Sequence, residues 1–225
     1  MLKKLIAVAA LLVAPLSQAA YVTINEAGMD AVFAQAHIDI RIGPVTSLFI
    51  PSFLDIDTDA EVTQLFSHHI GGAGVVNFYF IDTISACGGI DVNIIGCGQV
   101  NGPNFVVESA YAADTSIPFG GNTQVGVQLL AHELGHNLGL DHRNGDDLMN
   151  PFINGFGALN SAEIAQILLS PLVHAEANGQ LYIQINPVLV RAAVQAVPEP
   201  GTVLLVAAAL LMLAMARRRQ QRLER

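Results

Sequence analysis

Hydrophobic and polar residues follow one another along the middle of the chain in patterns that are typical of helices and strands in turn. Residues 25–36 predict a short helix, and residues 37–42 alternate with the period of two that a half-buried strand shows. Extended chain is expected over 47–56. Asp59 then stands where the N-cap of a second helix is expected, and this helix ends before Gly71.

The strongest strand signal lies at 75–81 (VVNFYFI), because β-branched and aromatic residues fill this segment almost without interruption. A shorter strand is expected over 104–109, and a long helix over 122–138. A last helix is expected over 159–171. Strands that precede a long helix within one domain predict an α+β or α/β fold.

The basic residues of the chain are concentrated at its two ends. The 225 residues are 52% hydrophobic and 13% charged, so the chain is too apolar for disorder and long enough to bury a core. The formal net charge is −9, and the part between the two ends has no lysine and is strongly acidic. Such a surface repels phosphate groups, so we expect neither a nucleic-acid partner nor adhesion to anionic lipid.

The N-terminal segment has the three parts of a secretory signal peptide. Two lysines precede an apolar run over 5–16, and Ser17 and Ala19 are the small residues at positions minus three and minus one of a signal-peptidase site. The alternative is a retained membrane anchor, but twelve apolar residues are fewer than the roughly 20 that a spanning helix needs. We therefore predict that 1–19 are removed by signal peptidase.

The C-terminal segment 197–225 also has an ordered pattern. Pro198, Glu199 and Pro200 precede fourteen unbroken apolar residues at 203–216, and a cluster of arginines follows. A helix of that length reaches about 21 Å, less than the roughly 30 Å of a bilayer core. The pattern resembles the PEP-CTERM sorting signal of Gram-negative bacteria. The resemblance implies recognition by an exosortase, transient anchoring in the inner membrane, and export to the cell surface or the medium. The alternative is a plain short anchor.

Cys87 and Cys97 are the two cysteines of the chain. An even number of cysteines in an exported protein favours a disulfide, here closing a small loop. Zinc binding by this pair is the weaker interpretation, because no histidine lies between them.

A run of acidic residues invites comparison with a calcium loop. The EF-hand pattern fails, because Ala60 stands in place of its glycine and Phe66 in place of its bidentate acid. The spacing therefore disfavours calcium binding by the acids of this run, which are Asp55, Asp57, Asp59 and Glu61.

The chemistry of the chain is concentrated in one segment, 127–151 (VQLLAHELGHNLGLDHRNGDDLMNP). His132 and His136 are four residues apart on a predicted helix, so both imidazoles project from one face and can bind one metal ion. Gly139 permits a turn, after which His142 can supply a third nitrogen. Three neutral nitrogens leave a fourth position open for water, as in catalytic zinc sites. Glu133 points beside the metal, where it can deprotonate a zinc-bound water.

The string HELGHNLGLDH at 132–142 fits H-E-x-x-H-x-x-G-x-x-H at every fixed position, and Met149 follows seven residues after His142. These features resemble the metzincin clan of zinc metalloendopeptidases, in which a methionine turn underlies the metal site. The resemblance implies an α+β fold with a mixed, twisted sheet packed on a long active-site helix. It further implies a protease domain over 20–196, with a small, mainly irregular or helical C-terminal subdomain after the third histidine.

The resemblance also implies roles for single residues. One catalytic zinc ion would be bound by His132, His136 and His142, with Glu133 as the catalytic base. Gly139 would form the turn and Met149 the floor beneath the zinc. A strand ahead of the active-site helix would pair with extended substrate, and the segment after the methionine would form the wall of a substrate pocket. The residues implied to line the substrate are Asn104, Phe105, Val106, Val107, Pro151 and Phe152.

Two features depart from the metzincin pattern. Arg143 follows the third histidine, where the subfamilies have aspartate, glutamate, serine or proline. Asn150 follows Met149, and no tyrosine lies nearby to act as an extra ligand. The subfamily therefore stays open. The other histidines lack partners at ligand spacing, and we expect none of them to bind metal: His37, His68, His69 and His174.

The sequence thus predicts an exported zinc-dependent endopeptidase that acts on protein or peptide substrates. The alternative is a surface or biofilm matrix protein that retains a zinc site without turnover. Glu133 favours the enzyme, because a structural zinc site has no use for a carboxylate beside an open coordination position.

Overall fold

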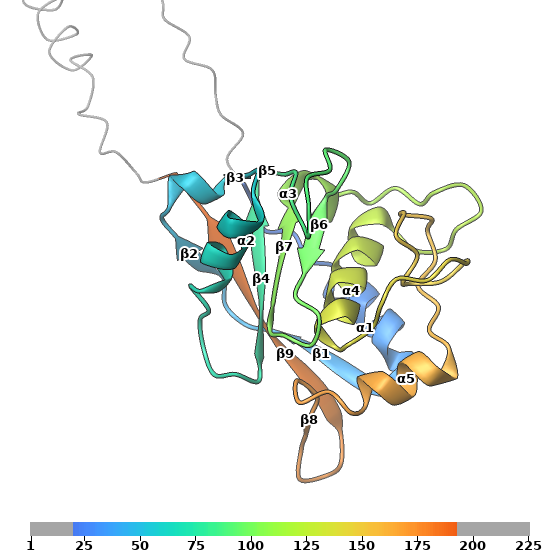
Figure 1. Ribbon diagram of the computed structural model, residues 1–225. Helices are drawn as coiled ribbons and strands as arrows, with labels where there is room; N and C mark the ends of the chain where they lie inside the picture. Colours follow the sequence, from blue (N-terminus) through green and yellow to red (C-terminus); the bar gives the residue numbers. More distant parts are fainter. Residues whose placement is uncertain (1–19, 193–225) are drawn as a thin grey trace, which may run out of the picture. The chain divides into compact units, whose positions relative to one another are not determined.

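The computed structural model describes residues 20–192, and one mixed sheet organises this part of the chain (Figure 1). The main path of the sheet runs in the order β1, β9, β4, β7, β6, and the short strands β2 and β8 pair with β9. Along this path the strands are parallel, except that β6 runs antiparallel to β7. The bounds are β1 Ile38–Ile42, β2 Thr46–Leu48, β4 Val75–Ile81, β6 Gly96–Gly98, β7 Asn104–Glu108, β8 His174–Ala175 and β9 Leu181–Val190, with β3 Asp55–Ile56 and β5 Thr83–Ile84 forming a separate pair.

Helices cover both faces of the sheet. On one face α1 packs on β1 and α4 packs on β6 and β7, whereas α2 contacts β7 from the other face (Figure 1). The predicted α+β class, with a mixed sheet packed on a long helix, is therefore confirmed. The bounds are α1 Glu26–Phe33, α2 Asp59–Phe66, α3 Ser109–Ala112, α4 Val125–Asn137 and α5 Ser161–Ile167, with short 3₁₀ helices at Ala34–Ala36 and Pro51–Phe53.

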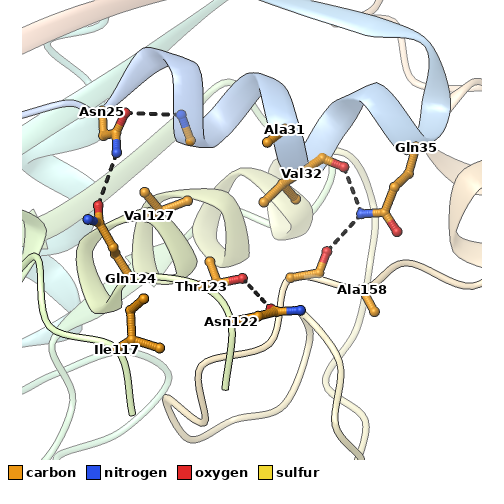
Figure 2. Close-up of a pocket in the computed structure, with 12 residues that line it drawn as sticks. Asn25, Ala31, Val32, Gln35, Ile117, Asn122, Thr123, Gln124, Val127 and Ala158 are labelled. Atoms are coloured by element: carbon orange, nitrogen blue, oxygen red, sulfur yellow. Dashed lines mark hydrogen bonds between the residues drawn. The ribbon is translucent and has the colours of Figure 1, made fainter. Parts of the chain in front are cut away.

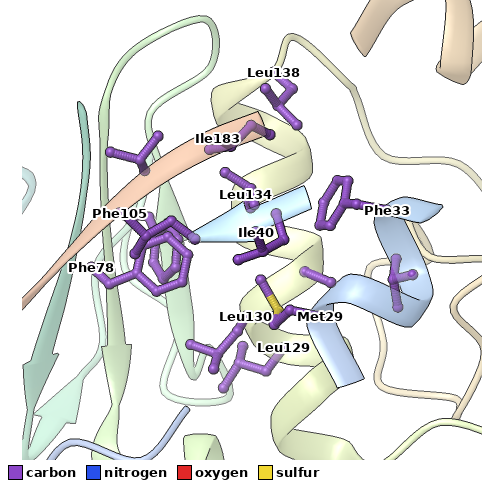
Figure 3. Close-up of a cluster of buried hydrophobic side chains, with 14 of the residues drawn as sticks. Met29, Phe33, Ile40, Phe78, Phe105, Leu129, Leu130, Leu134, Leu138 and Ile183 are labelled. Atoms are coloured by element: carbon purple, nitrogen blue, oxygen red, sulfur yellow. The ribbon is translucent and has the colours of Figure 1, made fainter. Parts of the chain in front are cut away.

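Alternate residues of β4 enter two different hydrophobic clusters, because successive side chains of a strand point to opposite faces. Phe78 belongs to the larger cluster, which lies between the sheet and the helices α1 and α4 and includes Phe33 and Leu134 (Figure 3). Tyr79 belongs to the second cluster, which Leu65 of α2 joins from the other side. The sheet is thus buried on both faces, as parallel sheets usually are.

Most predicted elements of the N-terminal half are present. The strand over 75–81 matches β4, and the helix over 25–36 is divided into α1 and a short 3₁₀ turn. The predicted cap of α2 is wrong by one residue. Thr58 is the N-cap, and its hydroxyl and Glu61 form a capping box, because the Thr58 side chain accepts from the Glu61 amide while the Glu61 carboxylate accepts from the Thr58 amide.

The expectation for the part after the third histidine needs correction. This part begins with irregular chain and α5, as expected, but it then returns to the sheet and supplies β9, a ten-residue strand between β1 and β4. A proline inside a strand normally argues against a central position, and Pro187 lies inside β9. However, β1 pairs with β9 up to Ile185 and β2 pairs from Val188, so Pro187 falls in the gap between them. On this side of β9 no strand pairs with Pro187, so its lack of an N–H group removes no ladder hydrogen bond there.

The predicted disulfide between Cys87 and Cys97 is present, with an S–S distance of 2.00 Å. Cys97 is the middle residue of β6, so the bridge ties this edge strand to the loop before it. The predicted signal peptide at 1–19 and the predicted sorting signal at 197–225 lie outside the described residues. Among residues 20–192, no helix has the length and apolar character needed to cross a membrane.

Candidate metal centre

Helix α4 carries three of the predicted site residues and is buried along almost its whole length. All residues at 126–137 are buried, as expected for a helix that lies between a sheet and other elements. Most of these side chains are apolar, and His132, Glu133 and His136 are among the polar exceptions. Because a buried polar group without a partner is costly, these side chains require bonding partners.

The three predicted histidines converge. The Nε2 atom of His142 lies 3.1 Å from the Nε2 atom of His132 and 3.1 Å from that of His136. The other ring nitrogens of the two helical histidines face backbone carbonyls: Nδ1 of His132 is 2.9 Å from the Leu148 oxygen, and Nδ1 of His136 is 2.8 Å from the Leu140 oxygen. In the described part of the chain these three histidines are the one group of metal-ligating side chains with such geometry.

The protonation pattern of the group fits a bound cation. A carbonyl oxygen accepts only, so Nδ1 of His132 and of His136 must each donate, and a neutral ring then has its lone pair on Nε2. Nε2 of His142 can carry at most one hydrogen, so it can donate to only one of these two lone pairs, whereas a cation between the rings can bind all three nitrogens. Zn–N bonds of 2.0–2.1 Å in a tetrahedral site place ligand nitrogens roughly 3.3 Å apart, close to the distances found here. The donor set therefore suits zinc.

Burial keeps the helical histidines neutral. It lowers the pKa of His132 to about 4 and also lowers the pKa of His136, since a charged imidazole loses hydration there. Burial acts in the opposite direction on Glu133 and raises the pKa of its carboxyl to about 8, with the nearby Gly98 amide opposing this shift. A cation bound by the histidines would favour the ionised carboxylate.

These pKa shifts predict how the stability of metal-free protein depends on pH. Between pH 8 and 6.5 the folded protein binds more protons than the unfolded chain, because the pKa of Glu133 is raised, so stability should increase as the pH falls. Between pH 6.5 and about 4 the unfolded chain protonates the imidazole that His132 holds neutral in the folded state, and His136, whose pKa is also lowered, acts in the same direction. Their contribution to stability is lost in that window as the pH falls.

Thermal unfolding in the presence of a chelator checks this expectation. In wild-type protein the two effects oppose each other between pH 6.5 and 4.5. In Glu133→Gln the gain from pH 8 to 6.5 should vanish, and the loss from pH 6.5 to 4 should become visible. A Glu133→Gln profile that parallels the wild-type profile from pH 8 to 4 would contradict the assigned shift of Glu133.

The predicted methionine and glycine lie where the motif places them. Met149 is fully buried, and its sulfur packs on Gly135 of α4. Gly135 lies between His132 and His136 in the sequence, and a Cβ atom on it would lie 2.5 Å from the Met149 sulfur. Gly139 has a φ of +91°, a left-handed conformation that side chains disfavour, and a Cβ there would also meet Asn101 at 2.5 Å. Glycine at 139 therefore permits the turn that leads to His142.

Glu133 lies beneath the edge strand β6. Its Oε2 atom is buried and has no hydrogen-bond partner among residues 20–192, which is uncommon for a buried carboxylate. The strand approaches closely because it has glycines on the facing side. A Cβ on Gly96 would lie 2.5 Å from Oε1 of Glu133, and a Cβ on Gly98 would lie 2.9 Å from Oε2 and from the His136 Cβ. Gly98 of β6 thus lies against both Glu133 and His136.

The prediction that strand 104–109 pairs with substrate is wrong. This strand is β7, and both of its edges are occupied, by β4 on one side and β6 on the other. Its predicted lining residues Asn104, Phe105, Val106 and Val107 are buried in the protein. The edge nearest the histidines is β6, whose three residues Gly96–Gly98 carry almost no strand signal.

The segment after Met149 is held in a defined loop. Gln128 of α4 accepts hydrogen bonds from the amides of Asn154 and Gly155 and donates to the Asn154 side chain. Pro151 and Phe152 lie on this loop and are exposed, with Phe152 77% accessible. Their predicted role as the wall of a substrate pocket remains a proposal.

Several residues that shape the site were not predicted. The carbonyls of Leu140 and Leu148 orient two histidines, but any residue offers a carbonyl, so no sequence signal exists for them. Gln128 did carry a signal, since it is a polar residue on an otherwise apolar helix, one turn before His132. Arg143 pairs with Asp147, a contact that spacing within a loop does not indicate.

The remaining histidines have other partners. Nδ1 of His69 lies 2.8 Å from the Asn104 side chain, Nε2 of His174 lies 2.8 Å from the Gly74 carbonyl, and His68 packs edge-on against Phe53. The fourth, His37, adopts a φ of +57° at the end of the 3₁₀ turn after α1.

The acids considered for calcium also serve local structure. Asp55 accepts from the Thr83 hydroxyl, Asp59 accepts from the amides of Gly88 and Gly89, and Glu61 is part of the capping box of α2. These contacts give Asp55, Asp59 and Glu61 roles in the local structure.

A separate cavity of about 590 Å³ borders α1 and the start of α4 (Figure 2). Its lining is neutral, and several of its polar groups bond to one another: the Asn25 amide donates to Gln124, and the Gln35 amide donates to the Val32 carbonyl. None of the predicted metal ligands lines it. The candidate metal centre is therefore distinct from this cavity.

Comparison with known proteins identifies the sorting signal. Residues 196–220 match the family model of the PEP-CTERM protein-sorting motif. The motif implies processing by an exosortase, and it indicates export and sorting to the cell surface in Gram-negative bacteria. No curated protein and no solved structure matched the chain. The chain is therefore an exported protein with a group of three histidines suited to a metal ion.

Proposed function

We propose that this protein is an exported zinc-dependent endopeptidase of the metzincin type. The observation that carries the proposal is the buried carboxylate of Glu133, whose Oε2 atom has no hydrogen-bond partner among residues 20–192 and which directly follows His132, one of the three histidines with convergent nitrogens, on α4. A purely structural metal site needs no such carboxylate. The metzincin motif, with Gly139 in a left-handed turn and Met149 against the helix, supports the same conclusion.

Each residue of the site has a defined task in this proposal. His132, His136 and His142 would hold the zinc ion, and the carbonyls of Leu140 and Leu148 orient the first two rings. Zinc supplies Lewis acidity, which polarises a carbonyl and makes water more acidic. The carboxylate of Glu133 accepts a proton from the attacking water at its free oxygen and passes it to the leaving amine.

We propose β6, instead of β7, as the strand that binds substrate. The Ile95 carbonyl accepts from the Glu108 amide, and the Gln99 amide donates to the Asn104 carbonyl, so these residues face β7. Because the direction alternates along a strand, the backbone groups of Gly96 and Gly98 point away from β7. An extended peptide can add to this free edge above Glu133. Pro151 and Phe152 would border the same cleft.

The finer steps of export also belong to the proposal. Signal peptidase would cleave after Ala19, and the apolar segment 203–216 would hold the protein transiently in the inner membrane. An exosortase would then process the C-terminus. The protein would reach the cell surface or the medium.

The alternative is a surface or biofilm matrix protein that binds zinc without turnover. One observation fits it: the sorting motif at 196–220 indicates delivery to the cell surface, where such a protein would be located. The catalytic role of Glu133 separates the two functions, because a matrix protein does not depend on it.

The proposal predicts one zinc ion per chain and peptide cleavage that chelators abolish. Zinc content is measured by mass spectrometry of the purified exported protein, and cleavage by digestion of a peptide library with and without chelator. Activity should return when zinc is added after the chelator is removed. Full activity in protein proven free of metal would rule out the proposed enzyme.

A further inference from the structure

Arg143 occupies the position directly after the third histidine and makes two ion pairs. Its Nε atom lies 3.1 Å from Oδ2 of Asp147, and its Nη1 atom lies 3.6 Å from Oε1 of Glu163 in α5. Its backbone amide also donates to the carbonyl of Met149 at 2.9 Å. Arg143 therefore joins both ends of the segment 142–149 and connects that segment to a separate helix.

The segment 142–149 contributes to the metal centre at three points. It contains the ligand His142, its Leu148 carbonyl accepts from Nδ1 of His132, and its Met149 packs on Gly135 of α4. A shift of this short segment would move one ligand, the orienting partner of a second ligand and the floor of the site together.

Both carboxylates that Arg143 contacts are largely buried. The side chain of Glu163 is only 10% exposed, and its second oxygen accepts from the Asn160 amide in the capping box of α5. The side chain of Asp147 is 11% exposed, and its Oδ1 atom is buried and has no hydrogen-bond partner in the described part of the chain. Ion pairs with such carboxylates are screened less than surface pairs, and removing the cation leaves buried charge uncompensated.

We propose that Arg143 is a positioning residue for the metal centre. Its ion pairs with Asp147 and Glu163 fix the segment 142–149 against α5, and so hold Nε2 of His142 at 3.1 Å from the other two nitrogens. The guanidinium suits this task because two of its nitrogens reach two different carboxylates, which a single ammonium group cannot do equally well. The inference rests on metal binding by the three histidines, which is part of the proposed function, but not on peptide hydrolysis.

The chain offers a matched control for the loss of an arginine. Arg41 of β1 also pairs with two carboxylates, with Nε 2.9 Å from Asp39 and Nη1 2.8 Å from Glu176. Its side chain is 34% exposed, compared with 44% for Arg143. Its ion-pair partners belong neither to α4 nor to the segment 142–149. Replacing Arg41 therefore removes a comparable pair of ion pairs away from the metal ligands.

The experiment compares Arg143→Met, Arg143→Lys and Arg41→Met in the full exported protein. Zinc affinity is measured by competition with a chelator of known affinity, and ligand geometry by the visible absorption of the Co²⁺-substituted protein. Loss of an outer-shell partner typically weakens metal binding 10–100-fold, and we expect this range for Arg143→Met, with an altered Co²⁺ spectrum. Arg143→Lys should be intermediate, and Arg41→Met should bind zinc like wild type.

The outcomes separate this inference from the proposed function. Wild-type protein that bound no zinc would overturn both. Wild-type protein that binds zinc, together with Arg143→Met that binds it equally well with an unchanged spectrum, would overturn the positioning role alone, as would equal weakening by Arg41→Met. If Arg143→Met fails to fold, Glu163→Gln provides the test, because it keeps the shape of the cap while removing one charge. An unchanged zinc affinity in a folded Glu163→Gln protein would then overturn the positioning role of Arg143.

Discussion

Replacing Glu133 by glutamine is expected to lower the rate of peptide cleavage by at least 10²–10⁴-fold, the usual contribution of a general acid or base. Glutamine keeps the size of the side chain but cannot take a proton from water. The bound zinc should remain, because the three histidines are unchanged. The measurements are kcat/KM on a cleaved peptide and the zinc content of the same preparation.

Two further variants give this result its meaning. Glu108→Gln is the control, because burial also raises the pKa of Glu108. The Glu108 carboxylate accepts from the Ile84 amide, so it has a structural partner, and the Glu108→Gln protein should cleave peptides at a near wild-type rate. His136→Ala should lose zinc and activity together, because it removes a ligand. If Glu133→Gln kept both its zinc and a near wild-type rate, another group would activate the water and the matrix protein would become the better hypothesis.

The histidine site was predictable because local geometry fixes it. Residues four apart on a helix share one face, so His132 and His136 could be placed together from their spacing alone. The third ligand depends on the turn at Gly139. Its φ of +91° is left-handed, a conformation that glycine adopts readily, and glycine is the residue that the motif has at this position. Spacing and one backbone requirement were therefore sufficient to assemble the three nitrogens.

The strands around the site were harder to predict, because their signals are weak or misleading. Strand β9 was not predicted. Pro187 inside it argues against an interior strand, and the gap between β1 and β2 that accommodates this proline depends on the fold. The edge strand β6 is only three residues long and contains two glycines, which are poor strand formers. Because the sequence does not predict β6, β7 is the last predicted strand before α4, and the metzincin resemblance then implies that β7 pairs with substrate. The error thus arose from strand order, which depends on contacts between distant parts of the chain.

The ion pairs of Arg143 show the same limit. The sequence marks this residue as a departure from the metzincin pattern but does not identify its partners. Glu163 is twenty positions away and on another helix, so the contact exists only once α5 has packed beside the segment 142–149. A departure from a motif can therefore point to a compensating contact, while the contact itself requires the fold.

Strand β9 leads to a prediction about folding, because a segment late in the described residues provides an interior strand of the sheet, between β1 and β4. Protein ending after Gln180 lacks β9, so β1 and β4 lose their shared neighbour and cannot pair in the observed order. Buried side chains of β9, such as Ile183 and Ile185, are also lost from the core. We expect such protein to show no cooperative thermal unfolding and no tight zinc binding.

Protein spanning 20–192 is the matched control, since it retains all of β9 and lacks the sorting motif. It should unfold cooperatively and bind zinc like the full chain, because the described core is complete within these residues. A point variant tests the same idea with less disruption: Ile185→Ala removes a fully buried side chain and should cost about 2–5 kcal/mol, whereas Leu169→Ala, at a side chain 79% exposed, should change the stability by less than about 0.5 kcal/mol. Cooperative unfolding with bound zinc in the protein that ends after Gln180 would contradict the central role of β9, because the rest of the sheet would then have closed without it.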